Sequence, residues 1–93
     1  MTKLRILCSK KLRHKEQIID IIQVGGVNSR GEKWTISSDV ARKGIQNGEY
    51  EFYIVQEFQE LAVSLSGREG EKILTVLGSG HLHNLLEGLP DCP

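Results

Sequence analysis

The chain has little of several residue types, and each scarcity excludes a class of protein. Only two cysteines, Cys8 and Cys92, occur in 93 residues, too few for a small domain built on a disulfide framework. The apolar run at residues 4–8 is broken by Arg5 and is too short for a signal peptide. No apolar segment approaches the ~20 residues of a membrane span. We therefore expect a soluble, cytoplasmic protein with no membrane partner.

Net charge is also lacking, because 12 basic and 12 acidic side chains cancel. A neutral chain lacks the field that draws proteins to nucleic acid, so we do not expect nucleic acid as a partner. The charges are nevertheless uneven: residues 3–15 contain basic but no acidic side chains, and residues 49–60 contain acidic but no basic ones. A solvated strand edge explains the basic segment more simply than a binding site does.

The length predicts a single domain over residues 1–93, since domains usually have ~100–150 residues. A domain of this size buries only roughly 60–65 % of the surface of its unfolded chain. Its apolar fraction of 39 % is slightly low. A homodimer or higher homo-oligomer would supply additional burial.

Alternating apolar residues predict short strands along most of the chain. We expect them at residues 3–8, 17–24, 34–36, 50–55, 60–66 and 71–77. Residues 9–15 are expected to form a polar connection, and residues 25–32 a glycine-rich hairpin loop. The four isoleucines at positions 18, 19, 21 and 22 also suit one face of a helix. We favour a strand, because branched side chains lose rotamer freedom in helices and pack well on sheets.

One helix is expected after residue 37. Ser37 and Ser38 offer an N-cap, Asp39 opposes the helix dipole, and Gly48 follows the last turn. Gly44 within the helix costs roughly 1 kcal/mol relative to alanine, so we expect it to allow a close approach to the sheet. The predicted fold class is α+β: a small antiparallel sheet of about five strands, with one helix packed on one face and a C-terminal clamp.

The outer face of this sheet is predicted to be apolar as well. Strict alternation places five residues opposite the main core face: Tyr53, Val55, Ala62, Leu74 and Val76. A lone small domain rarely exposes so much apolar surface, which also favours pairing with a second copy.

The C-terminal residues 81–93 are interpreted as the clamp. Asn84 is placed to satisfy backbone groups at the start of a turn, and Pro90 to end it. The side chains expected to cover an open apolar face are Leu82, Leu85, Leu86 and Leu89.

The reactive side chains in this tail are only weak evidence for a metal site or a catalytic site. His81 and His83 would share one face of a strand, but zinc would need two more ligands, for which Cys92 and His14 are the candidates. A Cys92 nucleophile with His83 as base lacks an orienting third group, and Cys8 is interpreted as a buried strand residue. We expect no metal, no cofactor and no enzymatic activity.

Binding is the function class that the sequence favours. Trp34 and Tyr53 are flat, amphipathic anchors, and basic side chains near Trp34, with the helix start, could hold an anion. The predicted ligand-binding residues are Arg30, Lys33, Trp34, Ser38, Arg42, Tyr53 and His83. The expected ligand is a small, anionic, nucleotide-like molecule, such as a signalling molecule that the protein sequesters. Trp34 as a plain core residue is the simpler interpretation.

Two alternatives stay open. The first is a protein–protein interaction or inhibitor module that uses the acidic residues 49–60. The second is nucleic-acid binding through the basic residues 3–15, which would weaken steeply with salt.

Several segments resemble one bacterial family, domain-of-unknown-function family number 3892. They are Trp34-Thr35, the helix with Val40 and Ile45, Gly48, the aromatic strand at residues 52–55, Leu74-Thr75, and the ending Asn84-Leu85-Leu86-Glu87-Gly88-Leu89-Pro90-Asp91-Cys92. The chain departs from the pattern at Gly78-Ser79, where Asp-Gly is usual, and at His83, where the family has an acidic residue. The resemblance implies the α+β fold and carries no function.

Overall fold

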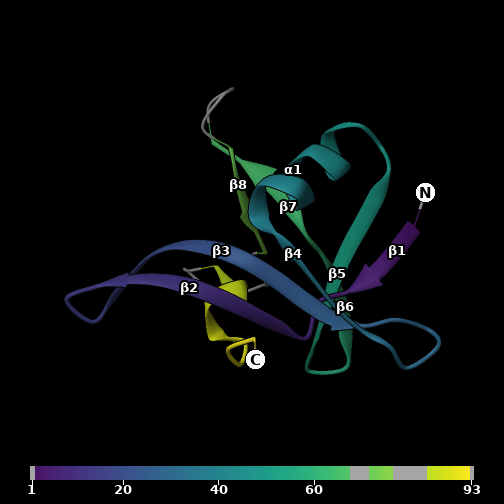
Figure 1. The fold of residues 1–93 in the computed structure, drawn as a ribbon, viewed down its shortest axis with the longest axis horizontal. Coiled ribbons are helices and arrows are strands. Elements are labelled where there is room, and N and C mark those ends of the chain that lie inside the picture. Colours follow the sequence, from purple (N-terminus) through teal and green to yellow (C-terminus); the bar gives the residue numbers. More distant parts are fainter. Residues whose placement is uncertain (1, 68–71, 77–83, 93) are drawn as a thin grey trace.

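The computed structural model describes residues 2–67, 72–76 and 84–92 and confirms the α+β class (Figure 1). The elements in chain order are β1 (Thr2–Arg5), β2 (Cys8–His14), β3 (Gln17–Val27), β4 (Lys33–Ser37), α1 (Ser38–Gln46), β5 (Tyr50–Gln56), β6 (Gln59–Ala62), β7 (Ser64–Ser66), β8 (Ile73–Thr75) and the short 3-10 helix η1 (Leu85–Gly88). Within the described residues, no helix has the length and apolar character needed to cross a membrane.

The described strands form three small sheets, where the sequence predicts one. Their orders are β1-β5-β6, β2-β3-β4 and β7-β8. Neighbouring strands are antiparallel except for β1 and β5, which pair in parallel. The predicted strand at residues 60–66 divides into β6 and β7 at Val63, whose side chain is buried in the core.

The isoleucine-rich segment is a strand, β3, and β-bulges explain its helix-like spacing. Its register with β2 shifts twice, leaving Ile22 and Ile19 without partners. Each bulge adds one residue and inverts the alternation of faces beyond it. Ile21 and Val24 are therefore both buried although they lie three positions apart.

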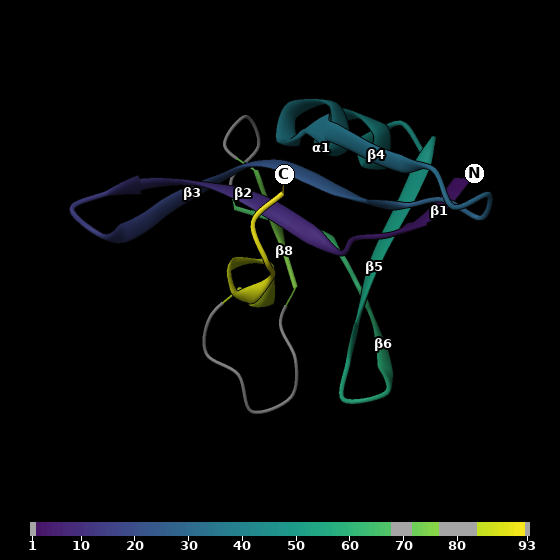
Figure 2. The ribbon, with the colours of Figure 1, turned by 60° about the horizontal axis from the view of Figure 1, so that its bottom comes forward.

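The prediction of a polar connection at residues 9–15 is wrong, because Cys8–His14 is strand β2. It pairs with β3 in a long hairpin that extends away from the rest of the molecule (Figures 1 and 2). The β2 strand has few apolar side chains toward the tip of this hairpin, where Leu12, Arg13 and His14 are exposed. Hydrophobic alternation could not reveal a strand that has so little core to face.

Gly25 and Gly26 also lie in a strand, not in the predicted loop. A side chain on Gly25 would come within 2.7 Å of the Trp34 carbonyl oxygen, and one on Gly26 would collide with the Arg5 carbonyl oxygen. These glycines therefore allow β3 to pass close to β4 and to the end of β1.

Helix α1 is confirmed with its predicted ends. The Ser37 hydroxyl accepts a 3.2 Å hydrogen bond from the Val40 N–H, and Gly48 adopts a φ of 74° after the last turn. Gly44 is buried against the Tyr50 ring, with which any Cβ at this position would collide. The close approach predicted for Gly44 is therefore present, between α1 and β5.

The core lies where α1, η1 and the sheets meet. Leu74 and Val76, predicted for the outer face, are buried in it, because β8 pairs with β7 and not with the sheet that contains β5. The outer apolar surface is consequently smaller than predicted: Tyr53 is half-buried, and Val55 and Ala62 are exposed. The buried apolar residues are Ile6, Ile21, Val24, Ala41, Phe52, Ile54, Val63, Leu74, Val76 and Leu86.

The tail forms the predicted clamp. Leu86 of η1 is fully buried. The Asn84 side chain accepts hydrogen bonds from the N–H groups of Val76 (3.0 Å) and Leu86 (3.1 Å) and donates one to the Leu74 carbonyl oxygen (2.8 Å). Asn84 thus caps η1, as expected, and also joins it to the end of β8. Leu82 lies outside the described residues.

The clamp is held to β2 as well. The buried Ser9 hydroxyl donates a 2.7 Å hydrogen bond to the Leu86 carbonyl oxygen. The backbone N–H of Ser9 donates a 3.0 Å hydrogen bond to the Pro90 carbonyl oxygen. The Lys11 ammonium donates to the Leu89 carbonyl oxygen and lies 3.1 Å from Asp91. Polar side chains of β2 therefore fix the backbone of the tail.

Cys8 and Cys92 form a disulfide, with 4.9 Å between their Cα atoms. The interpretation of Cys8 as a plain buried strand residue is therefore wrong, and Cys92 has no thiol to offer as a nucleophile or a metal ligand. The bond joins residues 84 positions apart in the sequence, so no local spacing could predict it.

Candidate functional site

The predicted ligand-binding residues lie in different parts of the molecule. Three surface hollows contain some of them, and we name each by one lining residue: the Tyr53 pocket, the Trp34 pocket and the Arg42 pocket. Ser38 is buried at the start of α1, and Arg30 is exposed in the turn between β3 and β4. His83 lies outside the described residues.

The Tyr53 pocket lies along β1, and its volume of about 390 Å³ is the largest of the three. Small-molecule sites usually occupy roughly 300–1,000 Å³. The parallel pairing of β1 with β5 places Arg5 beside Tyr53, and the Lys3 ammonium lies 5.0 Å from the centre of the Tyr53 ring. The lining residues are Thr2, Lys3, Leu4, Arg5, Val27, Asn28, Ser29 and Tyr53.

The charge in this pocket is positive. Lys3 forms an ion pair with Glu60 on β6, and the hydrogen bond to that carboxylate raises the pKa of the Lys3 ammonium above its ordinary value of 10.5. Arg5 is exposed and has no ion pair within the described part of the chain. The guanidinium of Arg5 is thus available to an anion, while Lys3 stays fully charged at neutral pH.

One rim of the Tyr53 pocket is a hydrogen-bonded turn. The Asn28 side-chain oxygen accepts hydrogen bonds from the N–H groups of Arg30 (2.9 Å) and Glu32 (3.0 Å), and the backbone groups of Asn28 and Glu32 also pair. Gly31 closes the turn with a φ of 82°. This rim is therefore held in place without a ligand.

The Trp34 pocket is smaller and apolar, with a volume of about 210 Å³. Trp34 packs on Phe52, with 6.0 Å between ring centroids, so the simpler interpretation of Trp34 as a core residue fits part of its surface. Its indole N–H is buried and has no hydrogen-bond partner in the described residues. The lining residues are Leu7, Cys8, Gly26, Val27, Lys33, Trp34 and Thr35, so Val27 lies between this pocket and the Tyr53 pocket.

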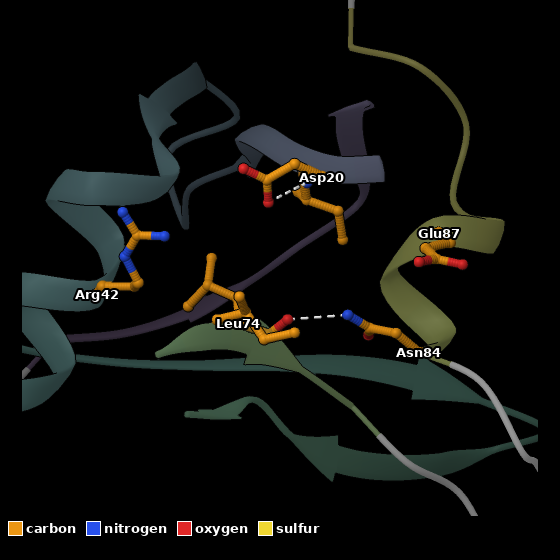
Figure 3. Close-up of a pocket in the computed structure, with 7 residues that line it drawn as sticks. Asp20, Arg42, Leu74, Asn84 and Glu87 are labelled. Carbon is orange, nitrogen blue, oxygen red and sulfur yellow. Dashed lines mark hydrogen bonds between the residues drawn. The ribbon is translucent and has the colours of Figure 1, made fainter. Parts of the chain in front are cut away.

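The Arg42 pocket is where α1, β3, β8 and η1 meet (Figure 3). Its volume of about 70 Å³ admits water but not a nucleotide. Arg42 forms an ion pair with Asp39 one turn earlier in the helix. Asp20 and Glu87 lie on other sides of the hollow, and Asn84 donates its hydrogen bond to the Leu74 carbonyl below them. Arg42 therefore does not share a pocket with Trp34.

Within the described residues, no three His, Cys, Asp or Glu side chains lie close enough together to bind a metal ion. His14 is exposed at the tip of the β2–β3 hairpin, and Cys92 is in the disulfide. The His81 and His83 pair lies outside the described residues.

Sequence reasoning missed Lys3, Arg5 and Asn28 as pocket residues. The basic segment was interpreted as a solvated edge, and only the parallel pairing of β1 with β5 brings it beside Tyr53. The usable signal in the sequence was an aromatic residue in one strand and two basic residues in another. No family model matches the chain, and no curated protein or solved structure proved detectably similar to it.

Proposed function

We propose that this protein is a non-enzymatic, self-associating binding module that holds a small, anionic, nucleotide-like ligand in the Tyr53 pocket. One observation carries the proposal: an aromatic ring, an ammonium and a free guanidinium line a hollow of ligand size. The ring offers a face to a planar group, and the Arg5 guanidinium, which has no ion pair in the described part of the chain, attracts phosphate. Arg30, next to Ser29 in the rim, adds a further positive charge at the pocket's edge.

The pocket lining supports holding a ligand without converting it. No carboxylate, imidazole or thiol is among its residues, and these are the groups that usually act as bases or nucleophiles near neutral pH. A protein that binds without chemistry can lower the free concentration of its ligand, which suits sequestration of a signalling molecule.

Calorimetric titration with mono-, di- and cyclic nucleotides tests the proposal. Tyr53→Leu removes stacking worth about 1–3 kcal/mol, so at least one nucleotide should bind about tenfold or more weakly. Arg5→Gln removes a charge-assisted contact and should weaken nucleotide binding about tenfold as well.

The matched control is Arg13→Gln, which removes the same charge from the exposed part of the β2–β3 hairpin. It should leave affinity unchanged. If Arg13→Gln weakens binding as much as Arg5→Gln, the attraction is non-specific. If no nucleotide binds to the unmodified protein, the proposed ligand class is wrong.

A second candidate, nucleic-acid binding, is favoured by the shape of the β2–β3 hairpin. This ribbon extends from the body of the molecule and exposes Lys10, Arg13, His14 and Lys15 (Figure 1). If it contacts phosphates, affinity for DNA or RNA should fall with salt, and Arg13→Gln should reduce the slope of log K against log salt by about 1. An unchanged slope would remove this candidate.

A further inference from the structure

Phe58 stands at the tip of the β5–β6 hairpin, with its side chain fully exposed to solvent (103 % of the reference area). The hairpin extends away from the body of the molecule (Figure 2). The ring therefore adds nothing to the core of the monomer and is free to meet a partner.

The backbone at this tip makes the choice of phenylalanine more unusual. Gln56 pairs with Gln59, so Glu57 and Phe58 alone form the turn, with φ values of 50° and 65°. Two-residue turns of this kind favour Asn-Gly, because both positions need a positive φ. Phenylalanine neither suits the positive φ of this turn nor packs against the core of the monomer.

The same chain carries a pocket of matching size and chemistry. The Trp34 pocket is apolar and has a volume of about 210 Å³, and an apolar cavity of about 150 Å³ is enough for a benzene ring. Leu7 and Val27 are partly exposed at this pocket, at 38 % and 40 %. A phenyl ring would cover them.

The charges around the two features are complementary. Phe58 follows the exposed Glu57, whereas Lys33 is exposed at the Trp34 pocket. An incoming hairpin would bring the Glu57 carboxylate toward this ammonium, and opposite charges fix the register of such a contact.

We propose that Phe58 of one copy inserts into the Trp34 pocket of a second copy. Each copy has both the side chain and the pocket, so a two-fold dimer makes the contact twice. The inference deepens the self-association in the proposed function and does not depend on the ligand. Because Val27 lies between the two pockets, the second copy would sit next to the Tyr53 pocket.

Trp34 is the only tryptophan in the chain, so its fluorescence reports on this contact directly. On dilution, the unmodified protein should show a red shift of Trp34 emission as analytical ultracentrifugation shows the dimer dissociating. Phe58→Gly should weaken dimerisation at least about tenfold, since it removes the buried ring. Glycine suits the φ of 65°, so this variant should not melt at a lower temperature as a monomer.

Val40→Ser is the matched control, because Val40 is an exposed apolar residue on α1 (48 %). It should leave dimerisation unchanged. Glu57→Lys and Lys33→Glu should each weaken the dimer, and the two combined in one chain should restore it.

The proposal is overturned if the unmodified protein stays monomeric at all concentrations, or if Phe58→Gly dimerises as the unmodified protein does. Loss of the dimer without any change at Trp34 would also overturn it. Nucleotide titration of Phe58→Gly distinguishes a failure of this proposal from a failure of the proposed ligand site, since the Tyr53 pocket is intact in that variant.

Discussion

Breaking the Cys8–Cys92 disulfide should lower the stability of the fold substantially. The bond closes a loop across 84 positions of the sequence, and the loss of denatured-state entropy for such a loop corresponds to about 4.5 kcal/mol at 25 °C. Measured values are usually about 2–4 kcal/mol. For a domain of 93 residues, each kcal/mol shifts the melting temperature by about 5 °C. We expect reduction to lower it by about 10–20 °C.

Thermal unfolding followed by circular dichroism, with and without a phosphine reductant, measures this difference. The Cys8→Ser/Cys92→Ser variant should melt near the reduced protein and should not respond to the reductant. Its tail keeps the hydrogen bonds to Ser9 and Lys11, so it should still fold.

Two results would refute this reasoning. One is an equal melting temperature with and without reductant. The other is the detection of two free thiols per chain in the denatured, unreduced protein. The second measurement also bears on location, because disulfides persist mainly in oxidising compartments. The cytoplasmic location remains a prediction, and a stable disulfide would argue against it.

Three further substitutions test the packing of the clamp and the helix. Asn84→Ala should cost about 2–3 kcal/mol in chemical denaturation, because it leaves backbone groups of β8 and η1 unpaired; a loss below 0.5 kcal/mol would contradict the hydrogen bonds. Ser9→Ala should cost about 1 kcal/mol by removing the bond to the tail. Gly44→Ala should lower the stability of the fold, because the added methyl group meets Tyr50. This holds although alanine has a helix propensity about 1 kcal/mol better than that of glycine. The exposed control Gln46→Ala should be nearly neutral.

Local sequence patterns predicted the parts of the fold that depend on local chemistry. Ser37 and Gly48 marked the ends of α1, because caps and positive φ values are properties of single residues. Gly44 signalled a close contact without revealing that Tyr50 makes it. Asn84 likewise signalled the start of η1, but not its bonds to the end of β8.

The missed features all depend on segments that are distant in the sequence. Alternation separates the two faces of a strand but does not say which face meets the core, so Leu74 was assigned to the wrong side. Trp34 and Arg42 are close in sequence but line different hollows, because α1 carries Arg42 toward η1. Arg5 gains its place beside Tyr53 only through the pairing of β1 with β5.

The attachment of the tail to β2 has a consequence for the order of folding. Ser9 and Leu86 are 77 positions apart, and β1 must wait for β5 before it can pair. Folding rates fall as the sequence separation of contacts rises. During synthesis at about 5–20 residues per second, the β2–β3 hairpin emerges several seconds before the tail, so Ser9 and Cys8 stay exposed in that interval. The nascent chain therefore offers an open strand and a free thiol that other proteins can reach before its own tail arrives.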